Sequence, residues 1–446
     1  MHAKSLLGYV IALACCCIWP AWGGLNIQHW ITSQGARVVF VENHDLPMLD
    51  VSVDFPAGSA RDRVGKAGLA GMTRHMMQLG AGVFSEKEVA ERLADVGAQL
   101  SSRGDSDRAG FVLRTLSAES ARTQALLTLR EILAAPRFSE DVLEREKARA
   151  IAGLQDAATR PEYLGGRAFA LALYADHPYG LPESGEPEDL ASLHRADLLA
   201  FYRQHYRATA MSLAVMGDIS RTQAEQLAEQ LASGLPTGEA PEAIRAVPDT
   251  AMGSERVIPH PASQSHVFIG LPGLTRDDPD YFPLYVGNYV LGGGGFDSRL
   301  MEAVRQKKGL AYSVYSYFSP MQARGAFQIG LQTRRESTDD AVATTRAVLK
   351  QFLEAGPSEA ELTQAKNNIV GGFPMRLDSN KKILEYLAVI GFYRLPPDWL
   401  DTYTARVEAI SRTEIVRAFR ARVRPTALHT VIVGGQLAAE SGQVPR

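Results

Sequence analysis

The N-terminal part of the chain alternates between apolar and polar positions in a pattern that predicts β-strands. Residues 38–41 form a short apolar run, and apolar side chains then occupy every second position from 49 to 55. A period of two is typical of a strand with one buried face. Residues 43–45, Asn-His-Asp, have the composition of a turn. We therefore expect these two segments to be paired strands joined across that turn.

Helical signals follow the strands. Residues 67–79 form one helical stretch, which ends at a glycine-containing break. Ser85 and Glu88 then have the spacing of a capping box. The residues after Ser85 place Val89 and Leu93 on one helical face. The pattern predicts a second helix that begins at this box.

The same series of elements occurs twice in the chain. Separated residues of the first half recur in the second half 216 to 219 positions later. Several matches with nearly one shift indicate an internal duplication. The matched pairs include Pro56 with Pro272, Phe111 with Phe327, Ser139 with Ser358, and Arg207 with Arg424.

Antiparallel strands with helices segregated from them indicate an α+β domain, and the duplication predicts two such domains in tandem. We expect a first domain over residues 24–235, a Pro- and Gly-rich linker over 236–254, a second domain over 255–437 and a tail over 438–446. Each domain should be an antiparallel sheet packed with helices. The two together would enclose a chamber, which is a natural binding site.

Composition narrows the classes of function. The chain has 446 residues, of which 46% are hydrophobic and 22% charged, so it is globular and large enough for more than one core. Its formal net charge of -3 gives no electrostatic attraction to nucleic acid or to an anionic membrane surface. We therefore expect no nucleic-acid partner.

Residues 1–23 have the features of a secretory signal peptide. Lys4 precedes an apolar run over residues 6–18, and the small-x-small triplet 21–23 forms a cleavage site. The apolar run is too short to span a bilayer. All three cysteines of the chain lie in this segment, and lipid attachment at Cys15 is the less favoured alternative. We expect export to the periplasm and no membrane span.

Residues 65–76, Gly-Lys-Ala-Gly-Leu-Ala-Gly-Met-Thr-Arg-His-Met, resemble the zinc-site signature of the pitrilysin and insulinase family of metallopeptidases. In that family, an H-x-x-E-H motif on one helix face supplies two zinc-binding histidines and a glutamate that activates water. The resemblance extends over almost the whole mature chain, from about residue 35 to residue 435, and it includes the order of the two halves.

The metal-binding residues implied by the resemblance are mostly missing from this chain. The first histidine of the motif corresponds to Gly71, the glutamate to Arg74 and the second histidine to His75. A later zinc-binding glutamate of the family falls on Ala152 or Gly153, and neither can bind a metal. The permanently charged guanidinium of Arg74 would repel a divalent cation. We therefore expect no metal and no catalytic residue in this chain, and we interpret His75 as a packed or solvated helix residue.

The second half resembles the family's C-terminal domain, most closely over residues 288–318. There an arginine and a tyrosine seven positions later hold the substrate backbone near the zinc, and the resemblance places them at Arg305 and Tyr312. Arg305 should leave a helix that ends at Gly309, and Tyr312 should begin the next strand, so that both reach one peptide carbonyl. From the residues alone, a solvated helix charge at Arg305 and a core strand residue at Tyr312 would be the simpler interpretation.

The glycines at 292–295 are not followed by the Lys-Ser/Thr of a phosphate loop, so we interpret them as a flexible turn.

Some members of the family work as pairs, in which one subunit holds zinc and the other supplies the arginine and the tyrosine. This chain has the pattern of the second kind. We expect a non-catalytic subunit that forms a heterodimer with a zinc-bearing paralogue and binds peptide substrate with Arg305 and Tyr312. The zinc would then lie in the partner. Two alternatives remain open: a non-proteolytic scaffold or peptide-binding protein on the same fold, and an active metallopeptidase with an atypical site.

Overall fold

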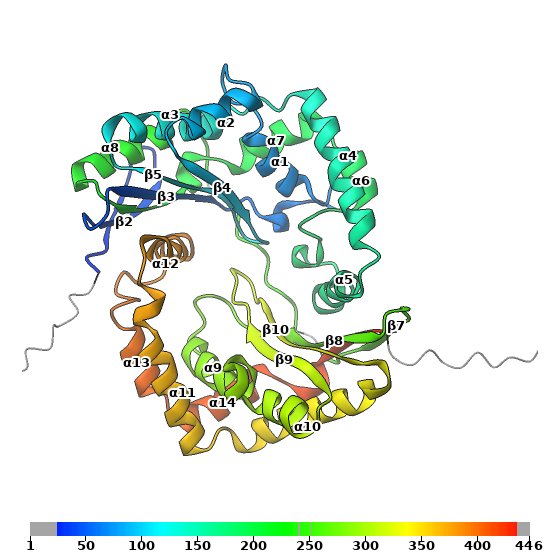
Figure 1. Ribbon diagram of the computed structural model, residues 1–446. Coiled ribbons are helices and arrows are strands. Elements are labelled where there is room, and N and C mark those ends of the chain that lie inside the picture. The colour runs from blue at the N-terminus through cyan, green and yellow to red at the C-terminus, as the bar shows by residue number, and fades with distance from the viewer. Residues whose placement is uncertain (1–24, 240, 250, 435–446) are drawn as a thin grey trace, which may run out of the picture.

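The computed structural model describes residues 25–239, 241–249 and 251–434. The predicted signal peptide, with its three cysteines, and the predicted C-terminal tail lie outside these residues. The described chain forms two α+β halves, each built on one β-sheet, and Figure 1 shows the first half above the second. The predicted fold class, two tandem sheets packed with helices, is confirmed.

The sheet of the first half has the strand order β1-β2-β6-β3-β5-β4. Neighbouring strands are antiparallel except β2 and β6, which are parallel. The strands are β1 (Gln28–Ile31), β2 (Arg37–Glu42), β3 (Met48–Phe55), β4 (Gln99–Gly104), β5 (Ala109–Leu116) and β6 (Ser212–Gly217).

The strands β2 and β3 are not neighbours, and the expected pairing across residues 43–45 is wrong. β6 lies between them, with Val215 opposite Phe40 on one side and Val51 on the other. Every residue of β6 is buried, which suits a central strand that is paired along both edges. The composition of residues 43–45 says nothing about a strand from a distant part of the sequence. The local pattern therefore could not predict that β6 lies between β2 and β3.

The helices of the first half lie mainly on one face of this sheet (Figure 1). The predicted helical stretch is α1, and the predicted capping box begins α2, where the backbone N–H of Ser85 donates to the Glu88 carboxylate at 2.8 Å. The helices are α1 (Leu69–Met77), α2 (Glu86–Ala94), α3 (Glu119–Ala134), α4 (Glu140–Ala157), α5 (Pro161–Tyr174), α6 (Pro187–Ala191), α7 (Arg195–His205) and α8 (Arg221–Ala232).

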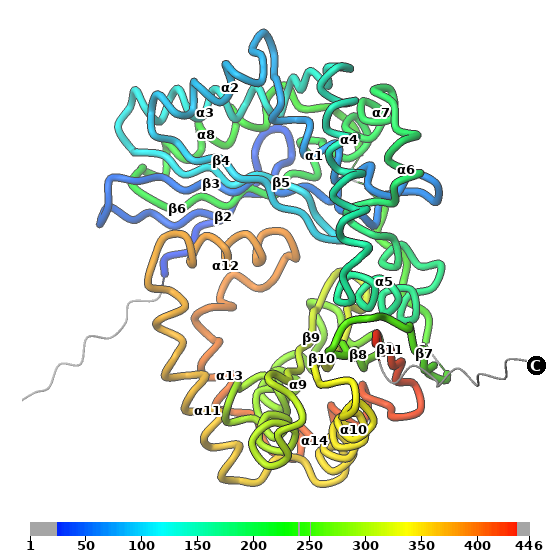
Figure 2. Tube along the Cα trace, turned by 45° about the vertical axis from the view of Figure 1, so that its right-hand side comes forward, coloured from blue at the N-terminus to red at the C-terminus, as the bar shows by residue number. Residues whose placement is uncertain are grey.

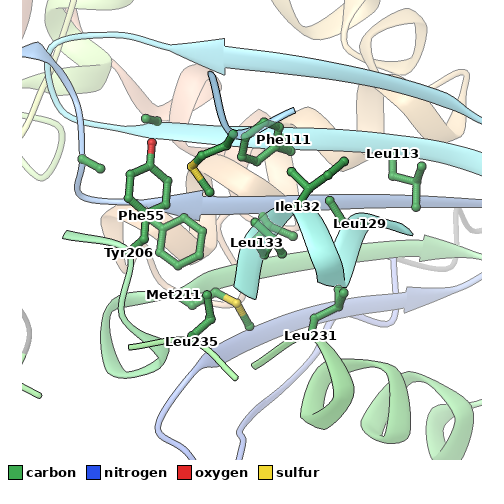
Figure 3. Close-up of a cluster of buried hydrophobic side chains, with 14 of the residues drawn as sticks. Phe55, Phe111, Leu113, Leu129, Ile132, Leu133, Tyr206, Met211, Leu231 and Leu235 are labelled. Atoms are coloured by element: carbon green, nitrogen blue, oxygen red, sulfur yellow. The ribbon is translucent and has the colours of Figure 1, made fainter. Parts of the chain in front are cut away.

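The core of the first half lies between the sheet and helices α3 and α8. Figure 3 shows part of this core, in which side chains from β3 and β5 meet those of the two helices. Each fully buried side chain of this size contributes about 1.5–3 kcal/mol of transfer free energy. The side chains labelled there are Phe55, Phe111, Leu113, Leu129, Ile132, Leu133, Tyr206, Met211, Leu231 and Leu235.

The second half repeats this arrangement. Its sheet has the order β7-β11-β8-β10-β9, which corresponds to β2-β6-β3-β5-β4 strand by strand, and its single parallel pair, β7 with β11, corresponds to β2 with β6. The strands are β7 (Glu255–Ile258), β8 (Gln264–Pro272), β9 (Ala311–Phe318), β10 (Ala326–Arg334) and β11 (His429–Val433). The α-helices are α9 (Tyr281–Asn288), α10 (Thr338–Ala355), α11 (Glu359–Gly372), α12 (Asn380–Tyr393), α13 (Tyr403–Ala409) and α14 (Arg412–Arg422).

Each half contributes one helix to the sheet of the other. Figures 1 and 2 show α5 of the first half lying on the second sheet and α12 of the second half lying against the first sheet. Phe169 of α5 packs on Phe268 of β8 with ring centroids 5.9 Å apart. Leu387 of α12 shares a buried cluster with Val39 and Met216 of the first sheet. This exchange joins the halves through apolar surface on both sides.

None of the helices in the described ranges is both long and apolar enough to cross a membrane.

Candidate functional site

The residues that correspond to the zinc motif line a pocket of 640 Å³ in the first half. Arg74 and His75 lie three and four positions after Gly71 on α1, which places all three residues on one face of the helix. The opposite face buries Met76 and Met77 in the core. Helix α4 forms the facing wall of the pocket.

The start of α1 is held by a buried carboxylate. Asp62 accepts hydrogen bonds from the backbone N–H groups of Gly68 and Ala70, both at 2.8 Å. These are donors that a helix cannot satisfy within its own first turn. Burial raises the pKa of Asp62 to about 7, against the effect of these two bonds. Gly68 has a φ of 91°, so the chain turns into the helix through a conformation that favours glycine.

His75 is paired with a glutamate that the motif did not single out. Its Nε2 lies 2.9 Å from Oε2 of Glu146 on α4. The Glu146 side chain is 3% exposed and also accepts from Arg145 at 2.8 Å and from Arg149 at 3.3 Å. Burial acts to raise the pKa of Glu146, but the hydrogen bonds from His75 and Arg145 outweigh it and leave the pKa below its ordinary value.

Arg74 occupies the position of the water-activating glutamate and has partners on two other elements. Its Nη1 donates to Oγ of Ser102 on β4 at 2.8 Å, and its Nη2 lies 3.9 Å from the carboxylate of Glu183. Burial raises the pKa of Glu183, and the charge of Arg74 partly opposes this. The Arg74 side chain is 18% exposed, so a permanent positive charge is fixed in the pocket wall.

Gly153 stands apart from the other three positions. It lies on α4 two turns beyond Glu146, is exposed, and does not belong to the pocket lining. The structure thus brings Gly71, Arg74 and His75 together but not Gly153. Sequence reasoning missed Glu146, although its place seven residues before Gly153 put it on the same face of the helix.

The donors in this pocket do not match a zinc site. Protein zinc sites use three or four N, O or S ligands, whereas Gly71 and Gly153 have no side chain and the imidazole of His75 is already bonded to Glu146. Across the residues that the structure describes, no group of three or more His, Cys, Asp or Glu side chains is arranged to hold a metal ion.

Arg305 and Tyr312 lie together in the second half. Arg305 is in the last turn of a π-helical segment (Met301–Lys307), Gly309 turns the chain with a φ of 62°, and Tyr312 is the second residue of β9. The guanidinium carbon of Arg305 lies 4.8 Å from the centroid of the Tyr312 ring and 4.9 Å from that of Phe296. Tyr312 is 81% exposed, so it is not a core strand residue.

A further pocket, of 630 Å³, lies between the halves. Asp105 and Arg108 of the first half line it together with residues of the second half. Those residues include Arg276, Tyr281, Tyr285, Tyr289, Tyr317 and Arg376. The space between the halves is therefore lined by both, as expected for a chamber.

Comparison with known proteins agrees with this geometry. Residues 37–183 match the family model for insulinase (peptidase family M16), and residues 192–369 match that for the peptidase M16 inactive domain. A crystal structure described as the peptidase M16 inactive domain from Pseudomonas fluorescens is 35% identical, with a TM-score of 0.90 over 93% of this chain and 99% of that one.

Two further relatives extend the comparison. The "non-peptidase homolog YmxG" of Helicobacter pylori is 27% identical over 404 residues, which are 90% of this chain and 92% of that protein. The periplasmic protease PqqL from Escherichia coli is 15% identical with a TM-score of 0.77, over 92% of this chain and 46% of that one, which is a likeness of fold alone.

Proposed function

This chain belongs to the M16 peptidase family, and we propose that it is a non-catalytic, peptide-binding subunit of a zinc peptidase that acts outside the cytoplasm. The zinc in this proposal is bound by a partner, a paralogue that has an intact H-x-x-E-H motif. The two chains form a heterodimer, and this chain contributes substrate contacts from Arg305 and Tyr312.

The observation that carries the proposal is the contact between the half-buried Arg305 and the exposed Tyr312. A guanidinium supplies several N–H donors in a fixed plane, and the phenol adds an O–H donor. Both side chains can donate to one peptide carbonyl. The rings of Tyr312 and Phe296 lie within cation–π distance of Arg305, which limits the rotamers of its side chain before a peptide binds. A side chain that is already ordered loses less entropy on binding.

The pocket on α1 supports the non-catalytic part of the proposal. Arg74 stands where the family has its water-activating carboxylate, and a guanidinium cannot accept a proton from water at neutral pH. Its bonds to Ser102 and Glu183 tie it into the wall of the pocket. The relative in Helicobacter pylori that is described as a non-peptidase homolog points in the same direction.

A secretory leader supports a place in the periplasm. Residues 1–23 combine a basic start, an apolar run and a small-x-small cleavage site. A zinc-bearing partner would have to be exported to the same compartment. Co-purification from the periplasmic fraction is therefore the direct way to find it.

The test is a peptidase assay on the complex recovered from that fraction, with and without a zinc chelator. We expect chelator-sensitive cleavage by the complex and none by this chain alone. A double substitution, Arg305→Ala with Tyr312→Phe, should reduce the rate of the complex about 10- to 100-fold, because hydrogen bonds to the substrate carbonyl are lost. Lys307→Ala on the same helical turn is the matched control. Its salt bridge with Glu302 is exposed, and its loss should leave the rate unchanged.

Two results would contradict the proposal in different ways. Stoichiometric zinc and peptide cleavage by the isolated chain would make it an enzyme in its own right. An active complex with an unchanged rate after the double substitution would remove the substrate contact and favour the scaffold alternative.

A further inference from the structure

Four arginines from both halves surround a pocket of 460 Å³ at the junction of the halves. Arg37, the first residue of β2, and Arg61 belong to the first half. Arg276 and Arg394 belong to the second half, and Arg394 directly follows α12. This pocket adjoins the pocket between the halves described above, because Arg276 lines both.

These arginines form no close ion pair within the described residues. In the part of the chain that the structure describes, none of the four takes part in an ion pair at 4.0 Å or less. The Nε atoms of Arg37 and Arg276 are buried without any hydrogen-bond partner. Arg61 donates through Nε to the carbonyl of Pro56 at 3.2 Å. A buried polar atom without a partner is uncommon in a native protein and calls for an explanation.

The charge of the pocket is unbalanced. Against four guanidinium groups, the lining contains only the carboxylates of Glu242 and Asp277. Burial lowers the pKa of Arg37, and the charge of Arg394 lowers it further. Burial also lowers the pKa of Arg61, although nearby acidic groups oppose this. Like charges that line one pocket repel one another, most strongly where burial limits solvation, as at Arg37 and Arg61, so a bound anion would stabilise the arrangement.

We propose that this pocket binds a small oxyanion that carries two or more negative charges, of the phosphate or polycarboxylate class. The planar fork of arginine matches the paired oxygens of both groups. A cleft lined by one sign of charge concentrates counter-ions of the other sign. Because both halves supply arginines, the bound anion bridges the halves and stabilises their contact.

The test measures binding of two probes, pyrophosphate and citrate, to the purified full chain by calorimetry at low ionic strength. We expect saturable binding of at least one probe, and the stronger of the two identifies the class of anion. The same probe should raise the melting temperature, since a ligand that binds only the folded state stabilises it.

Two substitutions and one control locate the binding. Arg276→Gln and Arg394→Asn should each weaken binding about tenfold or more, which is the effect of one lost charge-assisted hydrogen bond. Asn tolerates the φ of 55° at position 394, and that side chain is exposed, so this variant should fold normally. Arg256→Gln on β7 removes an exposed charge outside the pocket and should leave the affinity within about twofold.

The proposal is overturned if neither probe binds saturably, or if Arg256→Gln weakens binding as much as the two pocket variants. It does not depend on the peptidase partnership, because binding is measured on the single chain without substrate or zinc.

Discussion

Three side chains, those of one histidine and two arginines, converge on the buried carboxylate of Glu146. His75 approaches at 2.9 Å, Arg145 at 2.8 Å and Arg149 at 3.3 Å. The contact with His75 joins α1 to α4 at the pocket that corresponds to the family's zinc site, whereas Arg145 and Arg149 approach from α4 itself. At the residue scale, the imidazole of His75 therefore serves the packing of two helices, with a carboxylate as its partner in place of a metal.

Replacing Glu146 with Gln should lower the free energy of unfolding by about 1–2 kcal/mol at pH 7, since a buried charged acceptor is lost while its partners stay partly hydrated. The folded-state pKa of Glu146 lies below its ordinary value. Its ionised form therefore contributes stability above the unfolded-state pKa, near 4.3, and this contribution is lost as the pH falls through the folded-state pKa.

Urea denaturation of both proteins at pH 7 and at lower pH measures this effect. The difference between wild type and Glu146→Gln should shrink toward zero below about pH 4. Glu91→Gln, which removes an exposed partner of Lys87, should change stability by less than about 0.5 kcal/mol at either pH. A difference that is constant with pH would show that the charge of Glu146 is not what stabilises the pocket.

At the scale of elements, the exchanged helices α5 and α12 depend on close approach to the opposite sheet. Gly165 on α5 faces the ring of Phe268, and an added Cβ would lie 2.3 Å from the nearest ring carbon. Gly166, the next residue on the same helix, has open space at the corresponding position. Substituting these two adjacent glycines therefore separates the effect of packing against Phe268 from the intrinsic helix preference of alanine over glycine.

Gly165→Ala should destabilise the protein by about 1–3 kcal/mol, because the buried Phe268 ring must move. Gly166→Ala should stabilise it by about 0.5–1 kcal/mol, because alanine favours the helix and meets nothing. The melting temperatures of the two variants should therefore shift in opposite directions. If Gly165→Ala is as stable as Gly166→Ala, the contact between α5 and the second sheet is looser than described.

At the scale of the whole molecule, one buried carboxylate connects the two halves by hydrogen bonds. Asp107 lies in the loop between β4 and β5 and is fully buried. It accepts from the hydroxyl of Tyr179 in its own half. From the second half it accepts from the hydroxyl of Tyr393 at 2.9 Å and from the backbone N–H of Gln322 at 2.8 Å. The position of one half relative to the other therefore depends on this loop as well as on the exchanged helices.

Asp107→Ala should lower the free energy of unfolding by about 2–4 kcal/mol, since it removes the shared acceptor of three donors, one of which is the buried hydroxyl of Tyr179. Tyr393→Phe removes one of these bonds and should cost about 1 kcal/mol. Limited proteolysis of the predicted linker over residues 236–254 provides a second measurement, and cleavage should be faster in Asp107→Ala. Equal stability of Asp107→Ala and Tyr393→Phe would mean that the other two contacts contribute nothing.

The sequence by itself determined the features that depend on neighbours along the chain. The capping box at Ser85 and the duplication follow from residues a few positions apart or from repeated patterns, whereas the joint role of Arg305 and Tyr312 was implied by the resemblance to the family. The fold class follows from the same local signals, because they specify which elements form and in which order, and the family follows from the resemblance of residues 65–76 and 288–318 to its motifs.

Only the tertiary structure decided which distant segments meet. β6 lies between β2 and β3, α5 and α12 each pack on the sheet of the opposite half, and Glu146 is the partner of His75. The arginine pocket likewise draws its residues from both halves. The physical reason is that burial and charge pairing depend on which surfaces come together in space, and the periodicity of a segment records only that one of its faces will be covered.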